Sequence, residues 1–232
     1  MKYLSGVELY FSSDRIKENI IGISGDDYKH IVKVMRHSVG DEIYVTNGEG
    51  EICFSIIKEI KKDFLTAAVK KVLHYEDKFF NIFFCIPKLK SSDRLEFALE
   101  KCTELGITNF IIFDSERAIH KSIKKERWQK IVLSAMKQSL RSCLPKINAV
   151  NSLNEILKLD GRKILLEQTA GNKISSLEIN KDEKYYFIFG PEGGFTKEEI
   201  NLFNEKYKLA ENRLRTETAV IKCASVVLNS ED

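Results

Sequence analysis

Residues 79–113 read FFNIFFCIPKLKSSDRLEFALEKCTELGITNFIIF and combine three different patterns. Phe79–Ile86 is a compact apolar run, typical of a strand that is buried on both faces. A helical stripe of apolar residues follows, with Asp93 and Glu96 as a predicted capping box and Gly106 as the predicted end. Thr108–Phe113 is predicted to be the next strand. A strand, a helix and a second strand in this order indicate a parallel sheet.

The same alternation continues towards the C-terminus. The further predicted elements are strands at Lys163–Glu167 and Tyr185–Phe189, a helix at Arg127–Leu140, a helix capped by Thr196 and Glu199 that carries Ile200, Phe203 and Tyr207, and a helix at Ala219–Leu228. The last helix is almost wholly apolar, so we expect it to be buried. Alternating strands and helices predict an α/β fold whose mostly parallel sheet is covered on both faces.

The first 73 residues have a different sequence pattern. Short runs rich in β-branched and aromatic residues predict strands, and Asn47-Gly48 predicts a turn between two of them. The predicted strands are Val7–Phe11, Glu42–Thr46, Ile52–Ile60 and Phe64–Val72, and one helix is predicted at Asp26–Met35. This pattern indicates a small β-barrel with one helix, a fold that often presents a surface for nucleic acid or peptide. We expect two domains, residues 1–73 and 74–232, with a hinge near His74–Lys78.

Composition excludes several classes of protein. The 232 residues are 43% hydrophobic and 31% charged, with 12 Gly and 3 Pro, which excludes collagen, low-complexity polymers and wholesale disorder. No stretch approaches the roughly 20 apolar residues of a membrane-spanning helix, and the first residues lack the apolar core of a secretory signal. The five cysteines lie far apart without a CxxC pair, which favours neither disulfides nor zinc and indicates a reducing cytosol.

The charge is unevenly distributed along the chain. The net charge is only +3, but residues 117–146 hold nine Lys or Arg and a single acid, Glu126. Such a segment either binds a polyanion, because phosphate neutralisation releases counterions, or forms a solvated helix face. The sequence leaves both interpretations open.

Phe189–Thr196, FGPEGGFT, leaves a predicted buried strand and enters a capped helix. Open α/β sheets bind ligands at such positions. Gly193 and Gly194 permit positive φ angles and a close approach to the backbone, while Pro191 stiffens the turn. The stretch is neither GxGxxG nor a phosphate-binding P-loop, so it is either a ligand site of another kind or an ordinary turn.

Leu209–Ala219, LAENRLRTETA, leads into the apolar last helix. Arg215 and Glu217 stand at the start of that helix, where each loses hydration unless it finds a partner. They form either a salt-bridged helix cap or a polar site in which Arg215 donates to developing negative charge. Arg141, at the end of the basic helix, is likewise either a phosphate clamp or a partner of the helix dipole.

Other catalytic patterns are missing from the sequence. His30, His37, His74 and His120 lie in separate elements without the spacing of metal ligands, so we expect no metal site. No GxSxG nucleophile elbow occurs, and the dinucleotide glycine pattern of oxidoreductases is absent.

Several stretches together resemble the RsmE family, the ribosomal small-subunit RNA uridine-N3 methyltransferases of the SPOUT class. The matching residues are His30–Arg36 with Val39–Glu42, Lys101 with Glu104–Gly106, Glu126–Trp128 with Lys130–Ile131, Gln138–Arg141, Gly190–Thr196 and Leu214–Ala219. They occur in the family's order across nearly the whole chain. The GPEGGFT and LRTETA blocks are specific in combination.

The resemblance implies a fold and a reaction. The fold is a small β-barrel related to PUA domains, followed by a SPOUT α/β methyltransferase domain with a C-terminal trefoil knot. The reaction is S-adenosylmethionine-dependent methylation of uracil N3 in 16S ribosomal RNA. The resemblance also implies a cytoplasmic homodimer that acts on ribosomal RNA or the small ribosomal subunit, without membrane or metal.

The same resemblance implies site residues. Three loops, Leu165–Gln168, Phe189–Gly194 and Leu209–Ala219, are expected to hold the methyl donor. The expected donor-binding residues are Leu166, Glu167, Phe189, Gly190, Pro191, Glu192, Gly193, Gly194, Leu209, Leu214, Thr216, Thr218 and Ala219. The expected RNA-binding residues are Arg15, His30, Arg36, Arg127, Lys137 and Arg141. The catalytic candidates are Arg215, Glu217 and Arg141. Arg215 or Arg141 would stabilise a uracil anion, and Glu217, Glu192 or water would accept the proton.

Two positions depart from the family pattern. Ala210 stands where the family usually has Gly, and Arg213 stands where it usually has an aliphatic residue. A positive φ angle at Ala210 would be strained. Two alternatives stay open, a SPOUT-class methyltransferase that acts on another RNA and an RNA-binding assembly factor without catalytic activity.

Overall fold

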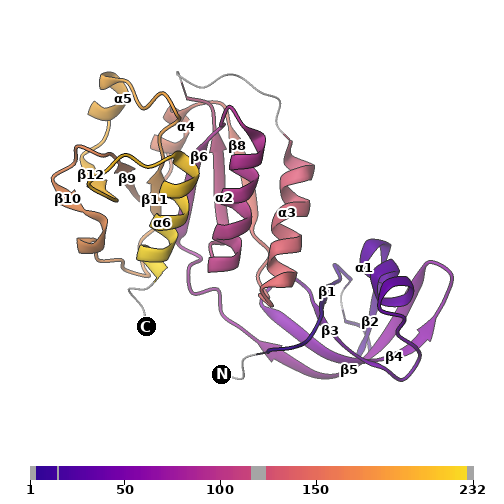
Figure 1. Ribbon diagram of the computed structural model, residues 1–232. Coiled ribbons are helices and arrows are strands. Elements are labelled where there is room, and N and C mark those ends of the chain that lie inside the picture. Colours follow the sequence, from indigo (N-terminus) through magenta and orange to yellow (C-terminus); the bar gives the residue numbers. More distant parts are fainter. Residues whose placement is uncertain (1–3, 15, 116–123, 229–232) are drawn as a thin grey trace. The chain divides into compact units, whose positions relative to one another are not determined.

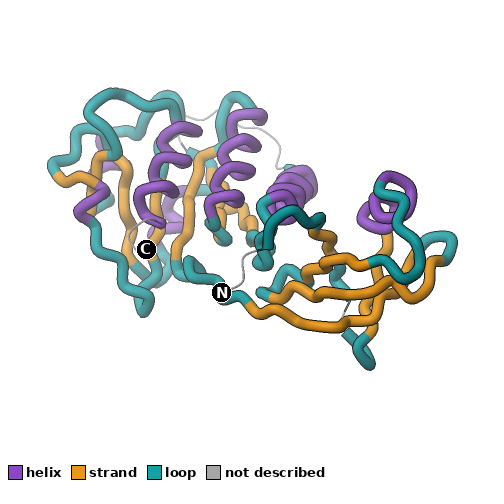
Figure 2. Tube along the Cα trace, turned by 60° about the horizontal axis from the view of Figure 1, so that its bottom comes forward, coloured by secondary structure: helices purple, strands orange, loops and turns teal. Residues whose placement is uncertain are grey.

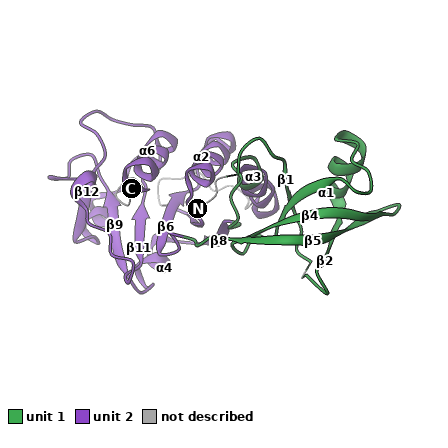
Figure 3. Cartoon of the chain, turned by 90° about the horizontal axis from the view of Figure 1, so that it is seen from below, with its two compact units in different colours: residues 1–77, 136–144 green, residues 78–135, 145–232 purple. Residues whose placement is uncertain are grey.

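The computed structural model describes residues 4–14, 16–115 and 124–228. The chain forms two compact units, residues 1–77 with 136–144, and residues 78–135 with 145–232 (Figure 3). The unit boundary thus falls four residues after the boundary expected at residue 73. Segment 136–144 joins the first unit because its backbone bonds to the turn at residues 47–50. Leu144 N donates to Gly48 O (2.8 Å), and Gly50 N donates to Ser142 O (3.0 Å).

The first unit contains a five-stranded sheet in the order β1-β3-β4-β5-β2 (Figure 1). Its strands are β1 (Leu9–Phe11), β2 (Ile20–Ser24), β3 (Glu42–Thr46), β4 (Glu51–Ile60) and β5 (Phe64–His74). The sequence pattern predicted four of these and missed β2. Ser12, at the end of β1, donates its hydroxyl to Gly22 O of β2 at 2.6 Å. The two edge strands therefore meet, and the sheet curls towards a barrel.

The helix predicted at Asp26–Met35 has two parts. An α-helix, α1 (Gly25–Lys29), continues as a π-helix, η1 (His30–Val34). Tyr28 and Ile31 of these helices pack into the barrel core with Tyr10, Ile23 and Val45. The predicted turn at Asn47-Gly48 is confirmed, because Asn47 Oδ1 accepts Glu49 N (2.8 Å).

The second unit contains a seven-stranded, wholly parallel sheet in the order β10-β12-β9-β11-β6-β7-β8 (Figure 1). The strands are β6 (Ile82–Pro87), β7 (Asn109–Phe113), β8 (Lys146–Val150), β9 (Arg162–Leu166), β10 (Asn172–Lys173), β11 (Tyr185–Ile188) and β12 (Glu205–Lys208). The predicted parallel α/β sheet is confirmed. Its carboxyl ends all lie at one edge, and its amino ends lie at the other.

Helices cover both faces of this sheet. They are α2 (Ser92–Leu105), α3 (Lys125–Gln138), α4 (Leu153–Leu157), a 3-10 turn η2 (Ile174–Ser176), α5 (Lys197–Asn201) and α6 (Thr216–Leu228). Leu153 and Ile156 of α4 pack against Cys85, Leu165 and Ile188 of the strands. The residues that alternate with these point to the opposite face, where α2 packs against α6. Helices flank the strands in Figure 2, and Figure 3 shows α4 on one side of the strand row and α2 with α6 on the other.

Two local predictions in this unit are wrong. Asp93 and Glu96 form no capping box, because α2 begins at Ser92 after Ser91, whose side chain makes no cap hydrogen bond. Glu96 instead pairs with Arg127 of α3 (2.6 Å). The helix predicted to carry Tyr207 ends at Asn201, and Tyr207 lies in β12. Within the described part of the chain, no helix is long and apolar enough to cross a membrane.

Candidate active site

Three loops at the carboxyl edge of the second unit's sheet enclose a cavity of about 580 Å³. They follow β9, β11 and β12. The lining residues are Arg94, Leu166, Glu167, Gln168, Phe189, Gly190, Pro191, Glu192, Gly193, Gly194, Phe195, Leu209, Ala210, Asn212, Arg213, Leu214, Arg215, Thr216 and Ala219. This edge is where parallel α/β sheets bind ligands. The volume lies in the range of small-molecule sites, about 300–1,000 Å³.

Two glycines shape the loop after β11. A side chain at Gly190 would bring its Cβ to 3.1 Å from the ring of Phe195, and Gly194 has a φ angle of +69°. Gly194 N donates to Pro191 O (2.9 Å), which closes the turn. The predicted Thr196 capping box is confirmed. Glu199 N donates to Thr196 Oγ1 (3.1 Å), and Thr196 N donates to Glu199 Oε2 (2.8 Å).

Side chains join this loop to its neighbours. Thr216, the first residue of α6, donates its hydroxyl to Gly190 O (2.8 Å). Arg213 Nη2 donates to Glu192 O (2.9 Å), and Lys90 N, after β6, donates to Glu192 Oε1 (3.1 Å). The loops after β6, β11 and β12 are thereby linked around the cavity. Ala210 is not among the described residues with a positive φ angle, so it carries no strain of that kind.

Three arginines lie along the cavity. Arg213 donates to Glu192 O. Arg215 is exposed, and its guanidinium has no hydrogen-bond partner among the described residues. Arg94, in the first turn of α2, forms an ion pair with Glu217, with 3.6 Å between Nε and Oε1. No motif in the sequence points to Arg94. Its only signal is its place at the start of a helix that follows a buried strand.

The expected donor-binding residues come together with one exception. Twelve of the thirteen line the cavity, and Thr218, which is exposed on α6, does not. Besides the three arginines, the cavity adds Gln168, Phe195, Ala210 and Asn212 to that set. Of the catalytic candidates, Arg215 lines the cavity. Within the described residues, Glu217 and Arg141 are not part of the lining.

Arg141 belongs to the first unit, where its side chain is partly buried. Burial lowers the pKa of its guanidinium. The RNA-binding candidates His30, Arg36 and Lys137 also belong to this unit. Lys137 pairs with Asp27 (2.8 Å), and the ring of His30 lies 6.0 Å from that of Tyr10. Asp27 and His30 lie within one helical turn of each other. The structure therefore groups basic residues from two distant parts of the sequence.

The remaining RNA-binding candidates differ in setting. Arg36 is exposed and has a φ angle of +59°, which a side chain rarely adopts. Arg127 lies in the second unit and pairs with Glu96. Arg15 lies outside the described residues.

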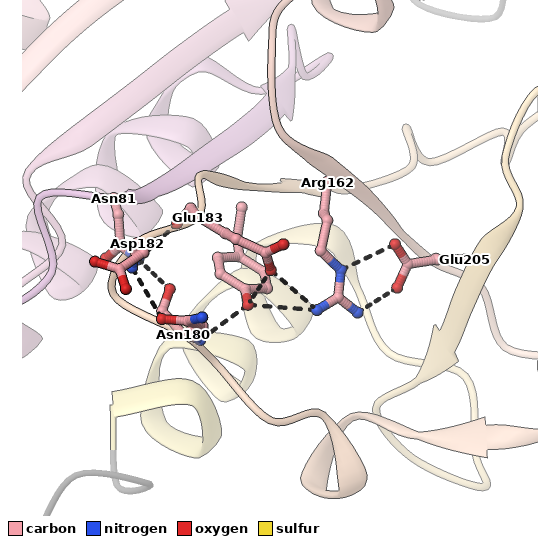
Figure 4. Close-up of polar contacts among 7 residues, drawn as sticks. Asn81, Arg162, Asn180, Asp182, Glu183 and Glu205 are labelled. Atoms are coloured by element: carbon pink, nitrogen blue, oxygen red, sulfur yellow. Dashed lines mark hydrogen bonds and ion pairs between the residues drawn. The ribbon is translucent and has the colours of Figure 1, made fainter.

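The opposite, amino edge of the same sheet carries a closed polar network (Figure 4). Arg162, Tyr185 and Glu205 are the first residues of β9, β11 and β12. Arg162 donates to both oxygens of Glu205 (3.1 and 2.5 Å) and to the hydroxyl of Tyr185 (3.3 Å). These hydrogen bonds raise the pKa of Arg162. Asn81 adds two bonds to the backbone at Asn180 (3.0 Å) and Glu183 (2.8 Å).

Known proteins match both units. The family of the RNA methyltransferase domain matches residues 76–228, and the RNA methyltransferase PUA domain matches residues 23–70. The chain is 29% identical to the ribosomal RNA small subunit methyltransferase E of Bacillus subtilis, covering 88% of each protein. It is 28% identical to the protein of the same name from Aquifex aeolicus, over 96% of this chain and 100% of the other.

Solved structures agree with the fold. A probable rRNA-methyltransferase from Porphyromonas gingivalis is 26% identical with a TM-score of 0.84, over 96% of this chain and 98% of that one. A ribosomal RNA small subunit methyltransferase E from Neisseria gonorrhoeae, solved bound to S-adenosyl methionine, is 24% identical with a TM-score of 0.82, over 97% and 98%. The first unit is thus PUA-like, and by the match over residues 76–228 the chain belongs to the RNA methyltransferase domain family.

Proposed function

We propose that this protein transfers a methyl group from S-adenosylmethionine to N3 of a uracil in 16S ribosomal RNA. The observation that carries the proposal is the cavity at the carboxyl edge, which the GPEGGFT and LRTETA segments line together. Both segments belong to the resemblance to the uridine-N3 methyltransferases. The relatives named ribosomal RNA small subunit methyltransferase E support the same substrate.

The cavity suits the chemistry of the methyl donor. Leu166, Phe189 and Leu214 offer apolar surface for an adenine ring, and Glu167 and Glu192 offer carboxylates to an ammonium or a sulfonium. Gly190 lies where a side chain would crowd Phe195, so the backbone itself forms that wall of the cavity. When bound, the donor supplies an electrophilic methyl group on a positively charged sulfur.

The protein's part in the reaction is to orient the base and to stabilise charge. Neutral uracil carries a proton on N3, which must leave before or during attack on the methyl group. The negative charge then spreads to O2 and O4. Arg215 is exposed on the cavity, and its guanidinium has no partner in the part of the chain that the structure describes, so we assign it to donate to one of these oxygens. Positioning of the two reactants supplies the rest of the rate enhancement.

The proton acceptor in this proposal is water. Glu217 does not belong to the described lining of the cavity and pairs with Arg94. The carboxylate of Glu192 accepts Lys90 N, and its carbonyl accepts Arg213. Glu217 thus holds Arg94, and one oxygen of Glu192 holds the loop after β6, so neither carboxylate is assigned to the proton. The positive sulfonium favours the anionic base, which lowers the demand on any general base.

The RNA presents an unpaired or flipped-out base, because a Watson–Crick pair occupies N3. His30, Arg36, Lys137 and Arg141 of the PUA-like unit, with Arg127 of the second unit, contact the RNA backbone and set its position. Arg15 belongs to the same expected set.

Three further properties complete the proposal. The chain is a homodimer, for which exposed Phe80, Phe97 and Leu105 offer apolar contact area on the second unit. Its C-terminal segment is knotted, which agrees with α6 packing against both α2 and η2. The protein works in the cytoplasm, where its RNA substrate is found.

Nucleoside mass spectrometry of 16S ribosomal RNA tests the proposal. RNA from cells that lack this protein is incubated with the purified protein and S-adenosylmethionine. We expect N3-methyluridine to appear only when protein and donor are both present. Methylation of another base or of a ribose would assign a different reaction. Saturable RNA binding without any methylation would assign an assembly factor.

A further inference from the structure

Arg94 is a cavity residue for which neither the sequence motifs nor the comparisons give a role. It lies in the first turn of α2, and 40% of its side chain is exposed. Its Nε faces Glu217 Oε1 at 3.6 Å. Within the described part of the chain, the two terminal nitrogens of its guanidinium have no hydrogen-bond partner. Arg94 therefore reaches the cavity with its two terminal nitrogens, the fork of the guanidinium, available to a ligand among the described residues of the cavity.

Glu217 explains why Arg94 holds this position. Only 12% of the Glu217 side chain is exposed, and its second oxygen, Oε2, is buried without a hydrogen-bond partner among the described residues. A buried carboxylate is costly unless a cation compensates it, so Arg94 and Glu217 stabilise each other. The pairing through Nε turns one side of the guanidinium towards α6 and leaves the other side for a ligand.

The free fork has a chemical preference. Two terminal N–H groups in one plane match the two oxygens of a carboxylate, which they bind as parallel hydrogen bonds. A lone carbonyl oxygen, such as those of uracil, engages only part of the fork. The methyl donor of the proposed reaction carries one carboxylate, in its methionine part.

We propose that Arg94 binds the carboxylate of the methyl donor and that Glu217 is the positioning residue that orients Arg94. This inference rests on the proposed function, since it takes S-adenosylmethionine as the ligand. It assigns Glu217 a role at the donor and separates it from proton transfer. Arg215 is left to act on the base.

Calorimetric titration of the full-length protein tests the assignment with two ligands. S-adenosylhomocysteine contains the amino-acid part, whereas 5′-methylthioadenosine lacks it. For Arg94→Ala we expect affinity for S-adenosylhomocysteine to fall about 10-fold or more, because a charge-assisted pair is lost. Affinity for 5′-methylthioadenosine should stay within about 2-fold. Arg94→Lys, which keeps the charge but not the fork, should fall between. Lys197→Ala, which removes an exposed cation outside the cavity lining, should match the wild type.

The role of Glu217 is tested by a double-mutant cycle. Glu217→Gln should weaken S-adenosylhomocysteine binding in the same direction as Arg94→Ala, and the double variant should bind no worse than Arg94→Ala alone. Additive losses would overturn the positioning role. Equal weakening of both ligands by Arg94→Ala, or a loss of methyl transfer with unchanged affinity for S-adenosylhomocysteine, would overturn the carboxylate assignment. Wild-type protein that bound neither ligand would instead overturn the proposed function.

Discussion

The two edges of the second unit's sheet use arginine in opposite ways. At the amino edge, the guanidinium of Arg162 donates to both oxygens of Glu205 and to the hydroxyl of Tyr185. Its central carbon also lies 5.1 Å from the centre of the Tyr185 ring. At the carboxyl edge, and counting only partners within residues 4–14, 16–115 and 124–228, Arg94 pairs through Nε alone and the guanidinium of Arg215 has no partner. The same type of side chain thus joins strands at one edge, and at the other edge we propose that it binds a ligand.

This difference follows from the geometry of a parallel sheet. At the amino edge, the first residues of β9, β11 and β12 bond to one another directly. At the carboxyl edge, the loops that follow the same three strands line a cavity instead. Satisfied donors add stability to the fold, whereas unsatisfied donors are available to a ligand.

The largest effect is expected at the carboxyl edge from Arg215→Ala. Loss of a donor to a developing oxyanion lowers the rate of a reaction by about 10²- to 10³-fold. We expect a decrease of this order in single-turnover methyl transfer, with donor affinity largely retained. An equal loss of donor affinity and turnover would place Arg215 in the donor site and break the division of roles with Arg94.

Arg162→Leu is the matched change at the amino edge. It removes hydrogen bonds to a charged partner, so we expect the free energy of unfolding to fall by about 1–3 kcal/mol. Urea denaturation followed by the fluorescence of Trp128, the single tryptophan, reports on the second unit. Affinity for S-adenosylhomocysteine should not change. A variant with wild-type stability but weakened binding would reverse the contrast between the edges.

Thr216→Val tests the tie between α6 and the loop after β11. The substitution keeps the shape of the side chain and removes the hydrogen bond to Gly190 O. We expect donor affinity to weaken by about 5- to 10-fold, since one neutral hydrogen bond contributes about 1 kcal/mol. Thr216→Ser should bind as the wild type does. Unchanged affinity in Thr216→Val would show that the loop holds its shape without this bond.

The smallest effect is expected from Arg213→Leu, which places an aliphatic residue where the family pattern has one. The bond from Arg213 to Glu192 O is exposed to solvent, so its loss should weaken donor binding by only about 2- to 3-fold. The dissociation rate of a fluorescent donor analogue, measured by stopped flow, resolves such a change. A loss above about 10-fold would make Arg213 a principal donor contact.

Much of the fold follows from local patterns in the sequence. The strand at Glu42–Thr46 and the Thr196 capping box lie where the patterns place them, because both depend on residues that are close in sequence. Strand β2 was missed because Gly22 interrupts a short run. The capping box predicted at Asp93 and Glu96 is wrong because α2 begins at Ser92, after Ser91, and Glu96 pairs with Arg127 of another helix.

The candidate site likewise contains residues that sequence motifs identify and residues that only contacts between distant parts of the chain reveal. Most of the cavity lies in three contiguous segments, so residues recognised as motifs also prove to be neighbours in space. Arg94 lies in α2, outside these three segments, and its position in the cavity depends on an ion pair with Glu217, which is distant in sequence. Lys137 and Asp27 show the same limit in the first unit, since no local pattern predicts that residues 136–144 join the barrel.

The most direct test of the cavity as a methyl-donor site is a crystal structure of the protein grown with S-adenosylhomocysteine. We expect the ligand among Leu166, Gly190 and Leu214, with its carboxylate on the terminal nitrogens of Arg94. A ligand bound elsewhere while these loops enclose only solvent would contradict the assignment of the carboxyl edge as the catalytic one.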